Sequence, residues 1–168
     1  MTESNTSEPC SSIAPVLGRI PSGVFILVAG GPDGRSTGLL ASWIQQASFA
    51  PPQVTIAVNK SRYLNDWLAV GSAITLNQVA KGDKVLFGHF GKGFEPDANA
   101  FQGIETTEGN NGLPVLKGAM ASMEGVLESK LDAGDHVIWL ANITVAHAHQ
   151  DPGGFDPYVH IRKNGLGY

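Results

Sequence analysis

The sequence predicts a mainly β protein, built as a closed or nearly closed antiparallel barrel with two or so short helices. In AMASMEGVLESKL (119–131), apolar and polar side chains alternate with a period of two, which is typical of a strand with one covered face. Apolar runs of strand length, bounded by turn residues, recur at 24–30, 54–58 and 73–79. A barrel is the expected arrangement because closure removes exposed sheet edges.

The first half of the chain predicts a hairpin, a strand and a helix. The run 24–30 is followed by the turn signal GGPDG, and 36–49 is expected to return as one strand that Pro51-Pro52 ends. After the buried strand 54–58, the apolar spacing in 61–71 becomes helical, with Ser61 as N-cap and a glycine as the stop.

The second half predicts two long strands after a loop-rich stretch. We expect a strand at 73–79, a short helix and loop at 82–94, loops at 95–114 with a turn at 110–112, long strands at 119–131 and 136–150, and at most a short strand near the C-terminus. In 119–131 the apolar face would carry Ala121, Met123, Gly125, Leu127 and Leu131, and the polar face Ser122, Glu124, Glu128 and Lys130.

Composition limits the functional classes. The 168 residues favour a single domain over 13–168, after a polar tail (1–12) that we expect to be disordered. The net charge of -4 argues against nucleic acid as the main partner. No apolar run reaches the roughly 20 residues of a membrane span, and the tail lacks the pattern of a secretory signal. The single cysteine, Cys10, excludes an internal disulfide, which favours the cytoplasm. In a tail, it also lacks the rigid site that a nucleophile needs.

Two stretches suggest a binding site for a flat anion. Lys60-Ser61-Arg62 stands where a strand gives way to a helix, and a helix N-terminus with nearby cations binds phosphate. An ordinary N-cap beside solvated cations explains the same residues. The preceding stretch 41–49 is rich in small and hydroxyl residues, which lets a flat ligand approach the backbone, although a tightly packed hairpin explains it equally.

These residues resemble the FMN-binding split-barrel flavin reductases. The shared order is GLLASWIQQASFAPP (38–52), a strand, Lys-Ser-Arg and a helix. Within that family, Ala-Ser-Trp, Ser-Phe-x-Pro-Pro, Gly-Asp-His and the ending His-x-Arg-Lys-x-Gly-x-x-Tyr are most similar to the flavin reductase module of cyanobacterial flavodiiron proteins. The resemblance covers about residues 16–168. Ala50 departs from it, because many relatives have Asp there, and this puts strand or dimer packing in doubt.

The resemblance implies a homodimeric split β-barrel with FMN near the dimer interface. The isoalloxazine would lie against the backbone of Ala41, Ser42 and Trp43. The phosphate would be held by Ser48, Lys60, Ser61 and Arg62. His160 matches the histidine near the nicotinamide of bound NADH or NADPH. Tyr168 matches the tyrosine that closes the motif, and it either covers the flavin pocket or frays.

Other candidates are weaker. His147 and His149 share a strand face at a spacing usable for metal, but no third ligand is apparent, so we expect exposed histidines and no metal. His89 and His136 have no other chemical groups around them, and Trp67 and Trp139 fit a core. No Gly-x-Gly-x-x-Gly follows a strand, which argues against a Rossmann domain.

The expected function is an NAD(P)H-dependent flavin reductase. It would transfer hydride from nicotinamide to flavin, and electrons onward to a partner such as a flavodiiron-type protein, to free flavin or to oxygen. One alternative is a non-catalytic carrier or sensor that binds FMN or heme in the same barrel. Another is a pyridoxamine-phosphate-oxidase-like enzyme, which would need a second cluster of cations that the sequence does not show.

Overall fold

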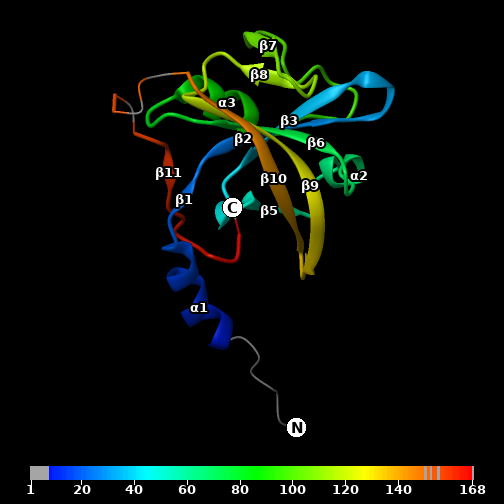
Figure 1. Cartoon of the computed structure of the whole chain (residues 1–168). Coiled ribbons are helices and arrows are strands. Elements are labelled where there is room, and N and C mark those ends of the chain that lie inside the picture. Colours follow the sequence, from blue (N-terminus) through cyan, green and yellow to red (C-terminus); the bar gives the residue numbers. More distant parts are fainter. Residues whose placement is uncertain (1–7, 150, 152, 155, 168) are drawn as a thin grey trace.

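The protein is a seven-stranded antiparallel sheet curled into a barrel, with smaller elements around it (Figure 1). The computed structural model describes residues 8–149, 151, 153–154 and 156–167, with side chains from Ser12 onward. The α-helices are α1 (Glu8–Gly18), α2 (Leu64–Trp67) and α3 (Lys84–Gly91), and η1 (Pro32–Gly34) is a 3₁₀ helix. The strands are β1 (Ser22–Gly23), β2 (Phe25–Gly30), β3 (Ser36–Ala41), β4 (Ile44–Phe49), β5 (Pro52–Asn59), β6 (Ala73–Gln78), β7 (Thr106–Glu108), β8 (Pro114–Leu116), β9 (Ala121–Ala133), β10 (His136–Ala148) and β11 (Val159–His160).

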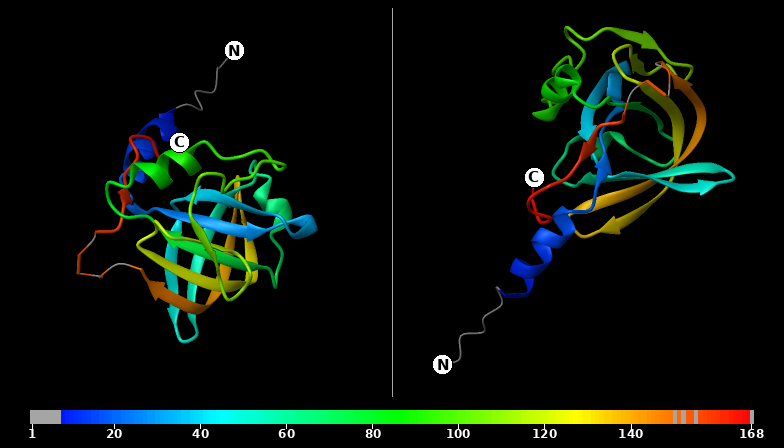
Figure 2. Two further views of the ribbon diagram at one scale, coloured as in Figure 1. Left: turned by 90° about the horizontal axis from the view of Figure 1, so that it is seen from above. Right: turned by 90° about the vertical axis from the view of Figure 1, so that its left-hand side faces the viewer.

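The predicted mainly β fold is confirmed, and the strand order explains how the barrel forms. The order is β3-β2-β6-β9-β10-β5-β4, so the two edge strands, β3 and β4, are neighbours in the sequence. The stretch 36–49, predicted as one strand, is therefore two strands separated at Ser42-Trp43. The prediction was wrong because β3 pairs with β2 whereas β4 pairs with β5. The chain thus crosses between the sheet edges, and the β4–β5 hairpin projects from the barrel (Figure 2).

A second correction concerns the segment after β5. The helix predicted over 61–71 is only the four residues of α2, and Tyr63, not Ser61, is its N-cap. Asn59 directs this segment into a turn, because its side chain accepts from the Ser61 N–H (2.9 Å) and its carbonyl from the Arg62 N–H (3.0 Å). The helix ends at Leu68, whose extended backbone places its side chain in the core. A helix this short offers no anion site at its N-terminus.

The N-terminal segment also differs from the prediction. Residues 8–12, assigned to a disordered tail, belong to α1, which extends away from the barrel (Figures 1 and 2). The C-terminal segment holds this helix, since the Gly165 N–H donates to the Ala14 carbonyl (2.7 Å) and the Arg162 N–H to the Gly18 carbonyl (2.9 Å). Local sequence does not reveal contacts of such long range. Residues 1–7 lie outside the described part of the chain.

The faces of β9 are the third correction. Ser122 and Glu124, predicted on an exposed polar face, are buried, with exposures of 1% and 2%. The Glu124 carboxylate accepts from Asn110 Nδ2 (3.1 Å) and from the Asn111 N–H (2.9 Å). The β7–β8 turn therefore covers this face and supplies hydrogen bonds to a polar side chain. The predicted apolar face is covered as well at Leu127, 1% exposed, although Leu131 farther along is 62% exposed. A period of two indicates which residues share a face, but it does not indicate whether the second face is covered too.

Two hydrophobic clusters position the remaining elements. One contains Trp139, 2% exposed, which confirms its predicted place in the core, whereas Trp67 is half-buried. The other packs α3 and the β7–β8 region on the sheet through residues such as Phe90. A Cβ at Gly38 of β3 would lie 2.5 Å from the Phe90 ring, so only glycine lets α3 approach this closely. The C-terminal end of α3 thereby lies beside β3. None of the described helices is long and apolar enough to span a membrane.

Candidate functional site

Two adjoining cavities lie along the seam of the barrel, the region where the free edge of β3 approaches the end of β5. The inner cavity, about 130 Å³, is enclosed by the end of β3, the end of β5, α3 and β11. Its lining includes three predicted site residues, Ala41, Ser42 and His160. The outer cavity, about 440 Å³, is bounded by the turn after β5 and the segment after α3. Arg62, also predicted, lines both cavities and joins them.

The β3 wall of the inner cavity offers backbone hydrogen bonds. In the sheet, β3 pairs with β2 alone, so every second residue of β3 directs its N–H and C=O away from β2. These groups are the donors and acceptors that an edge strand leaves unused. The rest of this cavity combines apolar side chains such as Val58 and Phe87 with the polar Asn59 and His160. A flat ring system with polar atoms along one edge matches such a surface.

The outer cavity is suited to an anion. Its lining includes Arg62, Lys92 and Ser61, residues that carry a guanidinium, an ammonium and a hydroxyl group, together with the acidic Glu95. Gly93 has a φ of +74°, and a Cβ there would lie 3.1 Å from Arg62 Nη1. Glycine therefore provides both the backbone conformation and the space that this guanidinium occupies. Arginine and lysine side chains form charge-assisted hydrogen bonds to phosphate, and a nearby hydroxyl can donate another hydrogen bond.

Lys60, predicted to bind the same phosphate, points elsewhere. Its Nζ lies 2.7 Å from Asp132 Oδ1 in the turn between β9 and β10, and it is absent from the lining of both cavities. The hydrogen bond and the charge of Lys60 lower the pKa of the Asp132 carboxyl below its ordinary value. The prediction assumed that neighbouring cations act together, but Lys60 pairs with Asp132 whereas Arg62 lines the two cavities.

Ser48 and Trp43 also lie away from the cavities within this chain. Ser48 pairs with Gln53 near the start of β5, whereas Lys60 directly follows the end of that strand. The seven residues from Gln53 to Lys60 correspond to about 23 Å along an extended strand. The Trp43 ring contacts the side chains of Arg162 and His136 instead of lining either cavity. Tyr168 lies outside the described residues.

Sequence reasoning missed the contribution of the α3 region. Asp83 caps this helix by accepting from the N–H groups of Val85 (2.9 Å) and Leu86 (3.0 Å). The helix ends in Gly91-Lys92-Gly93, and these three residues reach the cavities. A lysine between two glycines directly after a helix is the signal that could have identified this wall.

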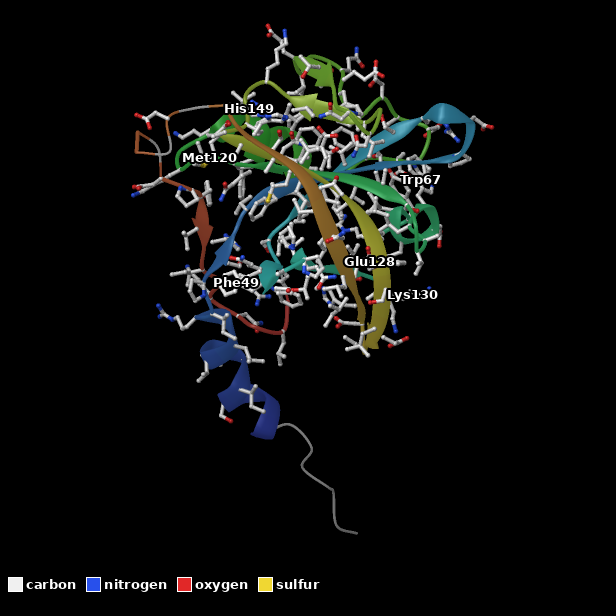
Figure 3. The ribbon with its side chains drawn as sticks, viewed as in Figure 1. Phe49, Trp67, Met120, Glu128, Lys130 and His149 are labelled. Atoms are coloured by element: carbon white, nitrogen blue, oxygen red, sulfur yellow. The ribbon has the colours of Figure 1, made fainter. Side chains whose placement is uncertain are left out.

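Two of the remaining histidines, His149 and His136, have structural contacts. His149 Nε2 lies 2.9 Å from Ser122 Oγ, and its N–H donates to the Met120 carbonyl (2.9 Å) where β9 begins (Figure 3). His136 is buried, and its Nδ1 lies 2.8 Å from Asp135 Oδ1. This hydrogen bond lowers the pKa of the Asp135 carboxyl. Among the residues with described positions, no group of three His, Cys, Asp or Glu could hold a metal ion.

Comparison with solved structures supports the fold. The chain is similar to the NADH:FAD oxidoreductase SgcE6 of Streptomyces globisporus, with a TM-score of 0.79 and 21% identity over 96% of this chain and 93% of that one. It is also similar to the flavin reductase HpaC complexed with NADP⁺, with a TM-score of 0.74 and 23% identity over 94% and 95% of the two chains. These matches confirm the predicted split-barrel architecture.

Comparison of sequences identifies the family. Diflavin flavoprotein A 1 of Synechocystis sp. is 35% identical over 159 residues, which cover 94% of this chain but 27% of that protein. The chain thus spans about a quarter of the length of the curated relatives it matches. The family model described as "Flavin reductase like domain" matches residues 17–165. The chain therefore belongs to the flavin reductase-like domain family.

Proposed function

We propose that this protein is an NAD(P)H-dependent flavin reductase that uses FMN and passes electrons onward. The observation that carries the proposal is the pair of connected cavities at the barrel seam, where the free edge of β3 meets Arg62 and His160. One cavity offers backbone groups for a flat ring, and the other offers cations for a phosphate. FMN combines these two chemical features in one molecule.

The residues present fit this cofactor. Arg62 and Ser61 would hold the phosphate in the outer cavity, with Lys92 as a further cation. The backbone of Ala41 and Ser42 would contact the ring in the inner cavity. Bound FMN supplies the ring that accepts a hydride from the nicotinamide. The protein contributes binding, orientation and the exclusion of water.

His160 would contact the nicotinamide donor. It reaches the inner cavity from β11, whereas Ala41 and Ser42 approach from β3. An imidazole in this place can hydrogen-bond to a carboxamide and orient the donor. The resemblance in the HIRKNGLGY motif supports the same role.

We further propose a homodimer, because several large apolar side chains are left exposed. Ile13, Val16 and Ile20 on and beside α1 are between 48% and 70% exposed, and Phe49 at the end of β4 is 88% exposed (Figure 3). Exposed apolar surface of this kind is typical of an interface. Multi-angle light scattering would measure the mass. Replacing Phe49 with serine is expected to shift it toward the monomer, with Val85→Ser, another exposed apolar residue, as control.

The electron acceptor is proposed from the relatives. Because the curated relatives are several times longer and are named as diflavin flavoproteins, we propose a flavodiiron-type protein as partner, with free flavin or oxygen as other acceptors. The chain's single cysteine cannot form an internal disulfide, which supports a reducing compartment, and we propose the cytoplasm.

The first experiment is a visible spectrum of the purified protein reconstituted with FMN, before and after anaerobic addition of NADH and then NADPH. Rapid loss of the yellow absorbance supports the reductase and identifies its donor. His160→Ala should slow that loss, whereas His147→Ala, at an exposed histidine outside the cavities, should not. A protein that stays yellow after both nucleotides have been added would favour an FMN-binding carrier or sensor instead.

A further inference from the structure

We propose that Trp43 and Arg162 are positioning residues that hold His160 against the inner cavity. The proposal rests on the proposed function, because it assigns to His160 a contact with the nicotinamide donor. Neither Trp43 nor Arg162 lines the two cavities at the seam. Both would act through the backbone segment that carries His160.

The first observation is a stack of three side chains. The Arg162 guanidinium carbon lies 4.7 Å from the centroid of the Trp43 ring. The same ring lies 4.6 Å from the His136 ring, at an angle of 34°. A cation at this distance over an indole is attracted by the electrons of the ring. Arg162 is therefore held on the Trp43 surface by an attraction that another cation, such as lysine, could partly replace.

The base of this stack is rigid. His136 is 5% exposed, and its Nδ1 lies 2.8 Å from Asp135 Oδ1. In the ladder between β10 and β5, His136 pairs with Asn59, which lines the inner cavity. The Trp43 ring thus packs against a residue that the barrel itself fixes.

The Trp43 backbone is bonded to the wall of the inner cavity. It follows Ser42 directly, and its carbonyl accepts a hydrogen bond from the Ala57 N–H at 2.9 Å. Both Ser42 and Ala57 line the inner cavity. The stack therefore connects the wall that would contact the flavin ring to the C-terminal segment.

His160 has little strand pairing of its own, so its place depends on the anchored residues on either side of it. Strand β11 has two residues and pairs only with the two residues of β1, as Ser22 with His160 and Gly23 with Val159. Both neighbours of His160 in the chain, Val159 and Ile161, are about half exposed. Two residues before His160, the Tyr158 ring stacks on Phe87 of α3 at 5.1 Å, and two residues after it Arg162 joins the segment to the barrel wall through Trp43.

The test is a double-mutant cycle on donor kinetics, in the intact protein reconstituted with FMN. Arg162→Ala is expected to raise the KM for the nicotinamide donor about three- to thirtyfold, the range for losing a cation–π contact. The Kd for FMN should stay within about twofold, because the stack lies outside the cavities. Arg162→Lys should restore most of the KM, and Lys163→Ala, at an exposed neighbour, should leave it unchanged.

The cycle separates a positioning role from a general structural one. In the His160→Ala background, Arg162→Ala should add no further loss, because the residue through which it acts is gone. Equal losses in both backgrounds, with unchanged circular dichroism, would overturn the positioning role while leaving the reductase proposal intact. If His160→Ala itself leaves the KM unchanged, the assignment of His160 fails, and the positioning role fails with it.

A fluorescence measurement supplies a readout that does not depend on turnover. The emission of Trp43 is obtained by subtracting the fluorescence spectrum of the Trp43→Phe variant from that of the unchanged protein. Arg162→Ala is expected to change this difference spectrum, and Arg162→Lys to restore it, because a cation over the ring alters its surroundings. A Trp43 emission that does not respond to Arg162→Ala would overturn the stack in solution.

Discussion

Arg62 and Lys60 differ by two positions in the sequence, and the structure predicts opposite consequences for their removal. Arg62 lines both cavities, whereas Lys60 Nζ lies 2.7 Å from Asp132. A hydrogen bond to a charged group contributes about 1.5–3 kcal/mol. Arg62→Ala should therefore weaken FMN binding about ten- to 150-fold, since 1.4 kcal/mol corresponds to a factor of ten. Lys60→Ala should change it less than about threefold.

The assay is calorimetric or fluorescence titration of the apoprotein with FMN and, separately, with riboflavin, which lacks the phosphate. Arg62→Ala should weaken FMN binding much more than riboflavin binding, because Arg62 lines both cavities but only FMN has the phosphate. Arg62→Lys should fall between, because lysine keeps the charge but loses the planar arrangement of donors. Equal losses for Lys60→Ala and Arg62→Ala would refute the reasoning. A loss of riboflavin affinity as large as that of FMN would refute the phosphate assignment.

Three further predictions concern stability. Gly38→Ala would place a methyl group 2.5 Å from the Phe90 ring and should lower the free energy of unfolding by about 1–3 kcal/mol, measured by urea denaturation. Glu124→Ala leaves two donors of the β7–β8 turn without their carboxylate and should also cost about 1–3 kcal/mol in the same assay; no change would mean that water replaces the carboxylate. The hydrogen bond with His136 lowers the pKa of Asp135, so its stabilising effect is complete above the ordinary pKa of about 3.9 and disappears as the pH falls through the lowered value. The melting temperature of Asp135→Asn should therefore depend less on pH below about 4 than that of the unchanged protein.

Patterns that depend on neighbours in the sequence predicted the strands well. The long strands β9 and β10, the buried β5 and the hairpin of β2 and β3 were all expected from apolar periodicity and turn residues. The burial of the polar face of β9 was not, because the β7–β8 turn that covers Glu124 lies in another segment. The break between β3 and β4 was missed for the same reason, since it depends on which strand each half pairs with.

The candidate site was predicted in part. Ala41, Ser42, Ser61, Arg62 and His160 do gather at the seam. The direction of a side chain is set by its partner, so sequence could not separate Arg62 from Lys60, whose partner Asp132 is far along the chain. The walls contributed by α3 were missed because helix packing on β3 depends on the absence of a side chain at Gly38.

The free edge of β3 has a consequence for how ligand occupancy could be observed. Its outward N–H groups belong to no ladder, so in the empty protein they should exchange with solvent deuterium quickly, although they lie in a well-formed barrel. A ligand that bonds to this edge would slow their exchange without any change in the fold. The exchange rates of alternate amides between Leu39 and Ser42 would then report ligand occupancy. The amides between them, which are bonded to β2, would serve as the reference.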